Sequence, residues 1–168
     1  MNKLLELDAR LSARLRIAEH PSWLRTLAAF LAHSGDSWFW LLGLGGVWLL
    51  GTQFWKQRAQ VFALGILLTA ILVMIIKFSV RRRRPEGEWG GIYRSTDPHS
   101  FPSGHAARVV MLAVLGCGLG PTWLSVTLVA WAPFVGLARV MMGVHYLSDI
   151  LAGALFGLVM GVLILVWL

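Results

Sequence analysis

Polar residues that could do chemistry stand in three short clusters at the ends of apolar runs. Ionisable side chains at membrane depth cost about 2.5–3.5 kcal/mol each on insertion scales, so their presence at such places suggests a functional role. The clusters hold Lys77 and Arg84, then Ser103, Gly104 and His105, and finally Arg139, His145 and Asp149. We treat these as the candidate site residues.

The cations and the serine in these clusters favour an anion as ligand. Lys77 and Arg84 are seven residues apart, which is about two turns of helix and roughly one face if the helix continues to Arg84. Arg139 adds a planar fork that can hold two phosphate oxygens. Ser103 precedes an apolar run and is a plausible helix N-cap, whose neighbouring backbone N–H groups would face an anion. Such an arrangement suits a transferring phosphoryl group.

The two histidines fit nucleophilic and acid catalysis. His145 and Asp149 have the i, i+4 spacing of one helix face, so the carboxylate can hold one ring nitrogen and leave the other free to attack. His105 can then protonate the leaving oxygen, which suits cleavage of a phosphomonoester through a phosphohistidine. The alternative is a metal site built from these three residues. The surrounding arginines favour an anion over a metal cation.

Composition indicates a membrane protein. The chain has 168 residues, of which 57% are hydrophobic and 14% charged, whereas soluble domains carry about 25% charged residues. This excludes disorder and most cytosolic enzymes, and the single cysteine, Cys117, excludes an internal disulfide framework. The net charge of +7 favours anionic lipid head groups or a phosphate-bearing substrate over nucleic acid. The bilayer is therefore the expected partner, and we expect no cofactor.

The apolar pattern predicts an all-α, polytopic transmembrane helix bundle of five to six spans, with an N-terminal amphipathic interfacial helix. Residues 1–36 form the N-terminal part, with an amphipathic helix in residues 1–20 and a possible short first span in residues 21–36. Residues 37–168 form the transmembrane bundle. Its expected spans are 37–54, 59–80, 103–119, 121–142 and 146–168, and its one long polar loop is 81–102.

The number of membrane crossings between the three clusters places all of them on the same membrane face. The first cluster ends one span and the second begins the next across the polar loop, so both lie on one membrane face. The chain then crosses twice more before the third cluster. Gly153, Gly157 and Gly161 repeat every four residues in the last span, which indicates close helix packing.

These motifs resemble the three-part signature of the type 2 phosphatidic acid phosphatase family, which includes vanadium haloperoxidases and glucose-6-phosphatase. The matching segments are Lys77-x6-Arg84-Pro85, Pro102-Ser-Gly-His105 and Arg139-x5-His145-x3-Asp149. The resemblance covers roughly residues 35–168 and implies metal-independent dephosphorylation of lipid phosphates by a helical membrane protein. Carried over, Lys77, Arg84, Ser103, Gly104 and Arg139 resemble the phosphate binders, His105 the general acid, His145 the nucleophile and Asp149 its partner. The third motif usually begins Ser-Arg, whereas Ala138 precedes Arg139 here.

Several other polar and aromatic residues have more than one interpretation. Arg108 is a possible accessory residue that touches substrate or pairs with an acid such as Glu86 or Glu88. We expect a charge cluster beside anionic lipid from Arg81, Arg82 and Arg83, ordinary helix-end positions for His33 and Asp36, a loop position for His99, and lipid-interface positions for Trp89, Tyr93 and Tyr146.

The function favoured by these observations is an integral-membrane lipid phosphate phosphatase. Its substrate would be of the phosphatidic acid, phosphatidylglycerol phosphate or undecaprenyl pyrophosphate type. The alternatives are a phosphotransferase of the same family, a vanadate-dependent haloperoxidase, and a non-catalytic lipid- or anion-binding membrane protein. The oligomeric state does not follow from the sequence.

We expect a multi-pass protein of a bacterial cell membrane, with its site on the extracytoplasmic side. This orientation assumes that residues 21–36 cross the membrane. The basic residues of the N-terminal helix would then lie opposite the site, beside Lys56 and Arg58. If residues 21–36 do not cross, those basic residues lie beside the site and favour a cytoplasmic site instead.

Overall fold

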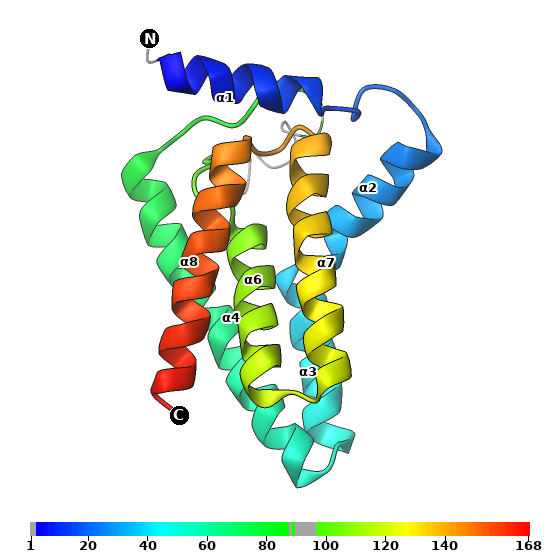
Figure 1. Cartoon of the computed structure of the whole chain (residues 1–168), viewed down its shortest axis with the longest axis vertical. Coiled ribbons are helices and arrows are strands. Elements are labelled where there is room, and N and C mark those ends of the chain that lie inside the picture. Colours follow the sequence, from blue (N-terminus) through cyan, green and yellow to red (C-terminus); the bar gives the residue numbers. More distant parts are fainter. Residues whose placement is uncertain (1–2, 88, 90–96) are drawn as a thin grey trace.

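The computed structural model describes residues 3–87, 89 and 97–168, and the described part is a bundle of helices (Figure 1). The helices are α1 (Lys3–Arg14), α2 (Trp23–Ser34), α3 (Ser37–Leu50), α4 (Gln53–Val80), α6 (Gly104–Leu119), α7 (Thr122–Met141) and α8 (Leu147–Val166). α4, α7 and α8 are each long and apolar enough to cross a membrane, whereas α3 and α6 are apolar but shorter. The predicted fold class is confirmed.

Helix α1 lies across one end of the bundle, roughly at right angles to the other helices (Figure 1). Leu4, Leu7 and Leu11 on this helix are exposed, whereas Ser12 is buried. The oxygen of Ser12 accepts a hydrogen bond from the backbone N–H of Leu147 at the start of α8 (2.9 Å). One face of α1 is therefore tied to the bundle, and the exposed leucines can enter the membrane surface.

Residues 21–36 do not form a span of their own, which changes the expected topology. A helix of 12 residues such as α2 is about 18 Å long, well short of the bilayer core. α2 starts at the end of the bundle where α1 lies, and α3 continues beyond the break at Gly35 and Asp36 to the opposite end (Figure 1). α2 and α3 thus make one interrupted crossing, and α1 lies at the same end as the polar loop.

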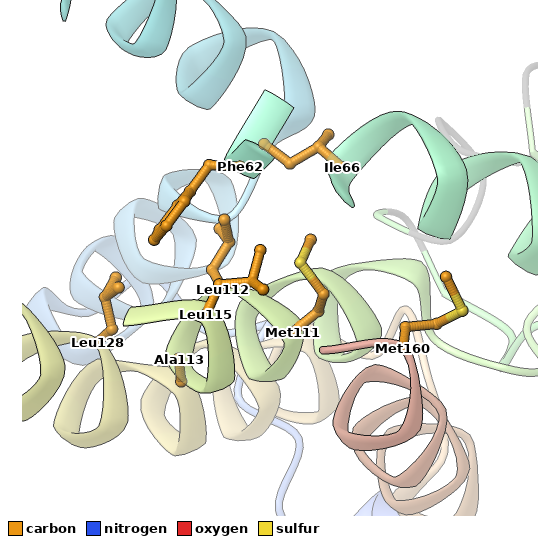
Figure 2. Packing of buried hydrophobic residues seen from close by; sticks show 8 residues of the cluster. All are labelled: Phe62, Ile66, Met111, Leu112, Ala113, Leu115, Leu128 and Met160. Carbon is orange, nitrogen blue, oxygen red and sulfur yellow. The ribbon is translucent and has the colours of Figure 1, made fainter. Parts of the chain in front are cut away.

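Helix α6 is the centre of the bundle. Met111, Leu112 and Leu115 of α6 are fully buried and pack with Phe62 and Ile66 of α4. Leu128 of α7 and Met160 of α8 complete this cluster around α6 (Figure 2). The polar first turn of α6 is thereby held at a fixed depth among the other helices.

The expected close packing at the glycine repeat is confirmed. A Cβ atom on Gly153 or Gly157 would overlap the backbone carbonyls of Ser103 and Ala107, and one on Gly161 would lie 2.6 Å from Val114 Cβ. Because α8 approaches α6 this closely, the backbone N–H of Ser103 reaches the carbonyl of Asp149 (2.9 Å). Two of the sequence clusters are therefore joined directly.

Candidate active site

His145 lies in the short connection between α7 and α8 with a side chain that is 1% exposed. Its Nε2 atom is 3.1 Å from Arg84 Nη1. A guanidinium group can only donate, so Nε2 is the acceptor and the ring proton belongs on Nδ1. Nδ1 lies 3.5 Å from Asp149 Oδ2, close to the carboxylate but beyond a normal hydrogen bond. The tautomer thus leaves a lone pair on Nε2, toward the cations.

Neighbouring charges explain the protonation state of His145. Burial lowers the pKa of His145 well below its ordinary value, and the positive charges of Arg84, Arg139 and Lys77 lower it further. The imidazole is therefore neutral at neutral pH, as a nucleophile must be. These three cations come from α4, the loop after it and α7, and all three act on the His145 ring.

Asp97 occupies the space between two of the predicted phosphate-binding cations. Lys77 Nζ forms an ion pair with Asp97 Oδ2 and also donates to the carbonyl of His99 (3.0 Å). Arg84 Nη2 contacts the same Asp97 oxygen at 2.7 Å, and Arg84 Nε donates to the Asp97 carbonyl (2.8 Å). A negatively charged oxygen therefore already bridges Lys77 and Arg84, as a phosphate oxygen would. No motif or periodicity in the sequence points to Asp97, which lies in the irregular loop.

The first turn of α6 has the predicted capping geometry. Ser103 is buried, and its hydroxyl accepts a hydrogen bond from the backbone N–H of Ala106 (3.3 Å). Gly104 is the first residue of the helix, and a Cβ atom there would lie 3.5 Å from Val73. The N-terminus of α6, with its partial positive charge, thus lies beside the start of α8.

Arg139 and Arg108 are both buried, but they have different surroundings. Arg139, in the last turn of α7, is 2% exposed and acts electrostatically on both His105 and His145. Arg108 Nη1 donates to the backbone carbonyl of Gly35 at the break between α2 and α3. Of the two interpretations of Arg108, the structure does not support pairing with Glu86, and contact with substrate stays a prediction.

The second histidine has a carboxylate partner that the sequence analysis did not assign. His105 Nε2 lies 2.6 Å from Asp36 Oδ1, and the two side chains are 16% and 18% exposed. The other carboxylate oxygen of Asp36 lies 3.1 Å from Nδ1 of His33. Asp36 is thus part of the site rather than an ordinary helix-end residue.

Arg82 is also part of the site, although it was expected to be a lipid-facing charge. Its Nη1 donates to Asp149 Oδ1 (2.7 Å) and to Ser148 Oγ (2.6 Å). Its Nη2 donates to Asp8 Oδ2 of α1 (2.8 Å). Asp8 also accepts from the backbone N–H of Ser148 (3.1 Å). Burial raises the pKa of Asp8, but the hydrogen bonds from Ser148 and Arg82 outweigh it and hold the pKa below its ordinary value. Helix α1 is therefore linked to Asp149 through one guanidinium group.

Some of the remaining polar and aromatic residues lie where the sequence placed them, and others do not. Arg81 and Arg83 are exposed, as a charge cluster at the membrane surface would be. The Arg82 guanidinium lies 4.1 Å from the centre of the Tyr146 ring, and Trp89 packs on the cluster between α2 and α7, so neither ring simply faces lipid. Tyr93 and Glu88 lie outside the described residues. Among the described residues, no three histidine, cysteine or acidic side chains gather in a way that could hold a metal ion.

Comparison with known proteins supports one family. The model of the PAP2 superfamily matches residues 58–168. A lipid A 1-phosphatase of Rhizobium etli is 31% identical over 163 residues, which cover 83% of this chain and 69% of that protein. A decaprenylphosphoryl-5-phosphoribose phosphatase of Mycobacterium tuberculosis is 29% identical, with 95% and 88% covered. A lipid A 1-phosphatase of Porphyromonas gingivalis is 34% identical, but the match spans only 24% of that protein.

Solved structures share the fold. The transmembrane PAP2-type phosphatidylglycerolphosphate phosphatase of Bacillus subtilis superposes with a TM-score of 0.79 at 22% identity, over 99% of this chain and 87% of that one. Aquifex aeolicus LpxE gives a TM-score of 0.74 at 24% identity, over 95% and 94%. The chain therefore belongs to the PAP2 superfamily, as a phosphatase embedded in the membrane.

Proposed function

We propose that this protein hydrolyses the terminal phosphate of a membrane lipid through a phosphohistidine at His145, without a metal ion. The observation that carries the proposal is the 3.1 Å contact between Arg84 Nη1 and His145 Nε2. This contact supports the proposal because the lone pair on Nε2 lies beside a cation that also contacts an anionic oxygen of Asp97, so an attacking nitrogen and a phosphate could share one pocket. Asp149, near the opposite nitrogen, stabilises the positive ring formed on attack.

The reaction would take two displacements at phosphorus. In the first, His145 Nε2 forms a bond to phosphorus, the bond to the lipid oxygen breaks, and that oxygen takes a proton from His105. In the second, His105 removes a proton from water, the oxygen of that water attacks phosphorus, and the bond to Nε2 breaks. Lys77, Arg84 and Arg139 stabilise the charge on the phosphoryl oxygens throughout. The Asp97 carboxylate must leave Lys77 and Arg84 before phosphate binds.

An apolar cavity supports a lipid as substrate. It has a volume of about 750 Å³ and lies between α6, α7 and α8. Its lining begins with Ala106 and Ile150, next to the site residues His105 and Asp149, and continues along α6 to Gly118. The 12 steps along the helix from Ala106 to Gly118 correspond to about 18 Å, enough for much of an acyl or prenyl chain. The tail would lie in this cavity while the phosphate reaches the cations.

Phosphate release by the purified protein tests this proposal. The substrates are phosphatidic acid, phosphatidylglycerol phosphate, undecaprenyl pyrophosphate and lipid A in detergent, with His145→Ala as the blank. We expect release from at least one lipid, no release by His145→Ala, and inhibition by vanadate but not by a chelator. Transfer of the phosphate to an added alcohol without free phosphate would identify a phosphotransferase instead. Full activity in His145→Ala would overturn the nucleophile assignment.

The orientation in the membrane depends on which of the two topologies left open by the sequence applies, and the one in which residues 21–36 do not cross fits α2 and α3 better. The extracytoplasmic placement assumed that the basic residues of α1 lie opposite the site, but α1 lies at the site end (Figure 1). Lys3, Arg10 and Arg14 of α1 then join the site end, whereas Lys56 and Arg58 lie at the other. The positive-inside rule now predicts a site on the cytoplasmic face of a bacterial cell membrane. A reporter at the C-terminus, which lies at the opposite end, should give an extracytoplasmic signal. A cytoplasmic signal would restore the original orientation.

A further inference from the structure

The interruption between α2 and α3 brings a carboxylate to the second histidine of the site. Asp36 is the N-cap residue of α3, a position where an aspartate usually accepts a hydrogen bond from the helix backbone. Its side chain makes no such bond here. Instead, one oxygen lies 2.6 Å from His105 Nε2 and the other 3.1 Å from His33 Nδ1. Local helix capping therefore does not explain this residue.

The surrounding chain is shaped to hold Asp36 in that place. A Cβ atom on Gly35 would lie 2.9 Å from Val135 Cγ1 and 3.3 Å from His105 Cδ2, so only glycine allows the break to approach α6 and α7 this closely. Arg108, one turn beyond His105, donates to the carbonyl of Gly35. The break is thus fixed to α6 by a backbone contact next to the carboxylate–imidazole pair.

The charges around His105 show why a carboxylate matters there. Arg139 and Arg108 act on His105 with positive charge, and the ring also lies within electrostatic reach of His145. These neighbours oppose a protonated imidazole, but a general acid must carry its proton when the leaving oxygen needs it. Asp36 is the negative group that acts on His105 among those the structure describes, and His33 is its other partner.

We propose that Asp36 is a positioning residue for the acid step, an inference that rests on the proposed function. Its carboxylate accepts the Nε2 proton of His105 in a hydrogen bond and so turns Nδ1 toward the leaving oxygen of the substrate. Its negative charge also stabilises the protonated ring in a pocket of cations. When His105 gives its Nδ1 proton to the leaving oxygen, the Nε2 proton stays on the ring beside Asp36.

The experiment compares Asp36→Asn with His33→Ala. Asparagine keeps the size and one acceptor oxygen but removes the charge, whereas His33→Ala removes the other partner of Asp36 and leaves the pair with His105 intact. General acid catalysis contributes about 10²–10⁴-fold, so we expect Asp36→Asn to lower kcat on a lipid phosphate about 100-fold with little change in KM. The alkaline limb of its kcat profile should move to lower pH. His33→Ala should stay within about threefold of the parent, since general acid catalysis remains.

A second substrate separates this role from a structural one. An aryl phosphate with a good leaving group needs little protonation, so leaving-group release in the first turnover should fall less than tenfold in Asp36→Asn. Equal losses on both substrates with an unshifted pH profile would overturn the proposal, as would parent-like activity on both. The proposed function is tested separately, because turnover of the aryl phosphate by His145→Ala would refute the nucleophile assignment whatever the result for Asp36→Asn.

Discussion

Substitution of Arg82 is the sharpest test of how the helix ends hold the site. Arg82 stands in a run of four arginines. Its neighbours Arg81 and Arg83 are exposed, whereas the side chain of Arg82 contacts Asp149. Arg82→Met keeps the length of the side chain and removes the charge and all donors. The variant loses hydrogen bonds to Asp149, Ser148 and Asp8 that are 2.6–2.8 Å long.

The magnitude follows from these contacts. Hydrogen bonds to charged groups contribute about 1.5–3 kcal/mol each, and two of the three partners are carboxylates. The side chain of Arg82 is 18% exposed, so water replaces part of the loss, and we take the lower end, about 3 kcal/mol. For a chain of this size, each kcal/mol lowers Tm by about 2–4 °C, which predicts a decrease of about 6–12 °C.

Thermal unfolding in detergent measures this change, and trypsin cleavage of α1 gives a second readout. Arg14 is already exposed, but a protease cleaves only an unwound segment, so loosening of the contact between Asp8 and Arg82 should let α1 unwind more often and increase the cleavage rate at Arg14. Arg81→Met and Arg83→Met are matched controls, since both side chains are exposed. We expect them to lie within about 2 °C of the parent, as surface substitutions usually do. The reasoning is refuted if all three variants unfold at the same temperature and are cleaved equally fast.

Three further predictions concern the pocket. Asp97→Asn removes the carboxylate that competes for Lys77, so vanadate inhibition should become about tenfold tighter, a change of about 1.4 kcal/mol; weaker inhibition would show that Asp97 supports the anion. Burial and the nearby cations lower the pKa of His145 below the ordinary value of about 6.5, so the acid limb of kcat/KM should lie below that pH; a limb above it would contradict the lowered pKa. Gly136→Leu narrows the apolar cavity beside Ile150. It should raise the KM for long-chain substrates several-fold and leave the KM for a short-chain analogue unchanged. Equal effects on both KM values would show that the lipid tail lies elsewhere.

The sequence was enough to predict that the motif residues converge, because the patterns that predict it can be recognised within short stretches of the chain. Helical spacing relates His145 to Asp149, the crossing order places the clusters at one end, and the serine before an apolar run marks the start of α6. The structure brings these residues together as expected, and their catalytic roles remain our proposal. The close packing at the glycines of α8 could also be predicted, since small residues four apart indicate a close contact between helices.

The residues that the sequence analysis missed depend on contacts between distant, irregular segments. An aspartate before an apolar helix usually caps it, so the local pattern at Asp36 favoured the wrong partner. Arg82 cannot be told from Arg81 or Arg83 by type, and only the placement of α1 and α8 selects it. Asp97 lies in a loop without periodicity. The sequence left the topology of residues 21–36 open for a related reason, because it does not reveal that the break at Gly35 lies between two short helices that follow each other across the bundle.

The most direct test of the account is to find the phosphorylated residue. His105→Ala should still accept a phosphoryl group from an aryl phosphate with a good leaving group, but it lacks the base that activates water for the second displacement. The phosphoenzyme should therefore accumulate, and an alkaline quench preserves the phosphorus–nitrogen bond for peptide mapping. We predict a stoichiometric phosphoryl group on the peptide that contains His145, and none in the variant that also carries His145→Ala. Labelling of another residue, or first-turnover release of the aryl alcohol with no phosphoenzyme, would contradict the central claim.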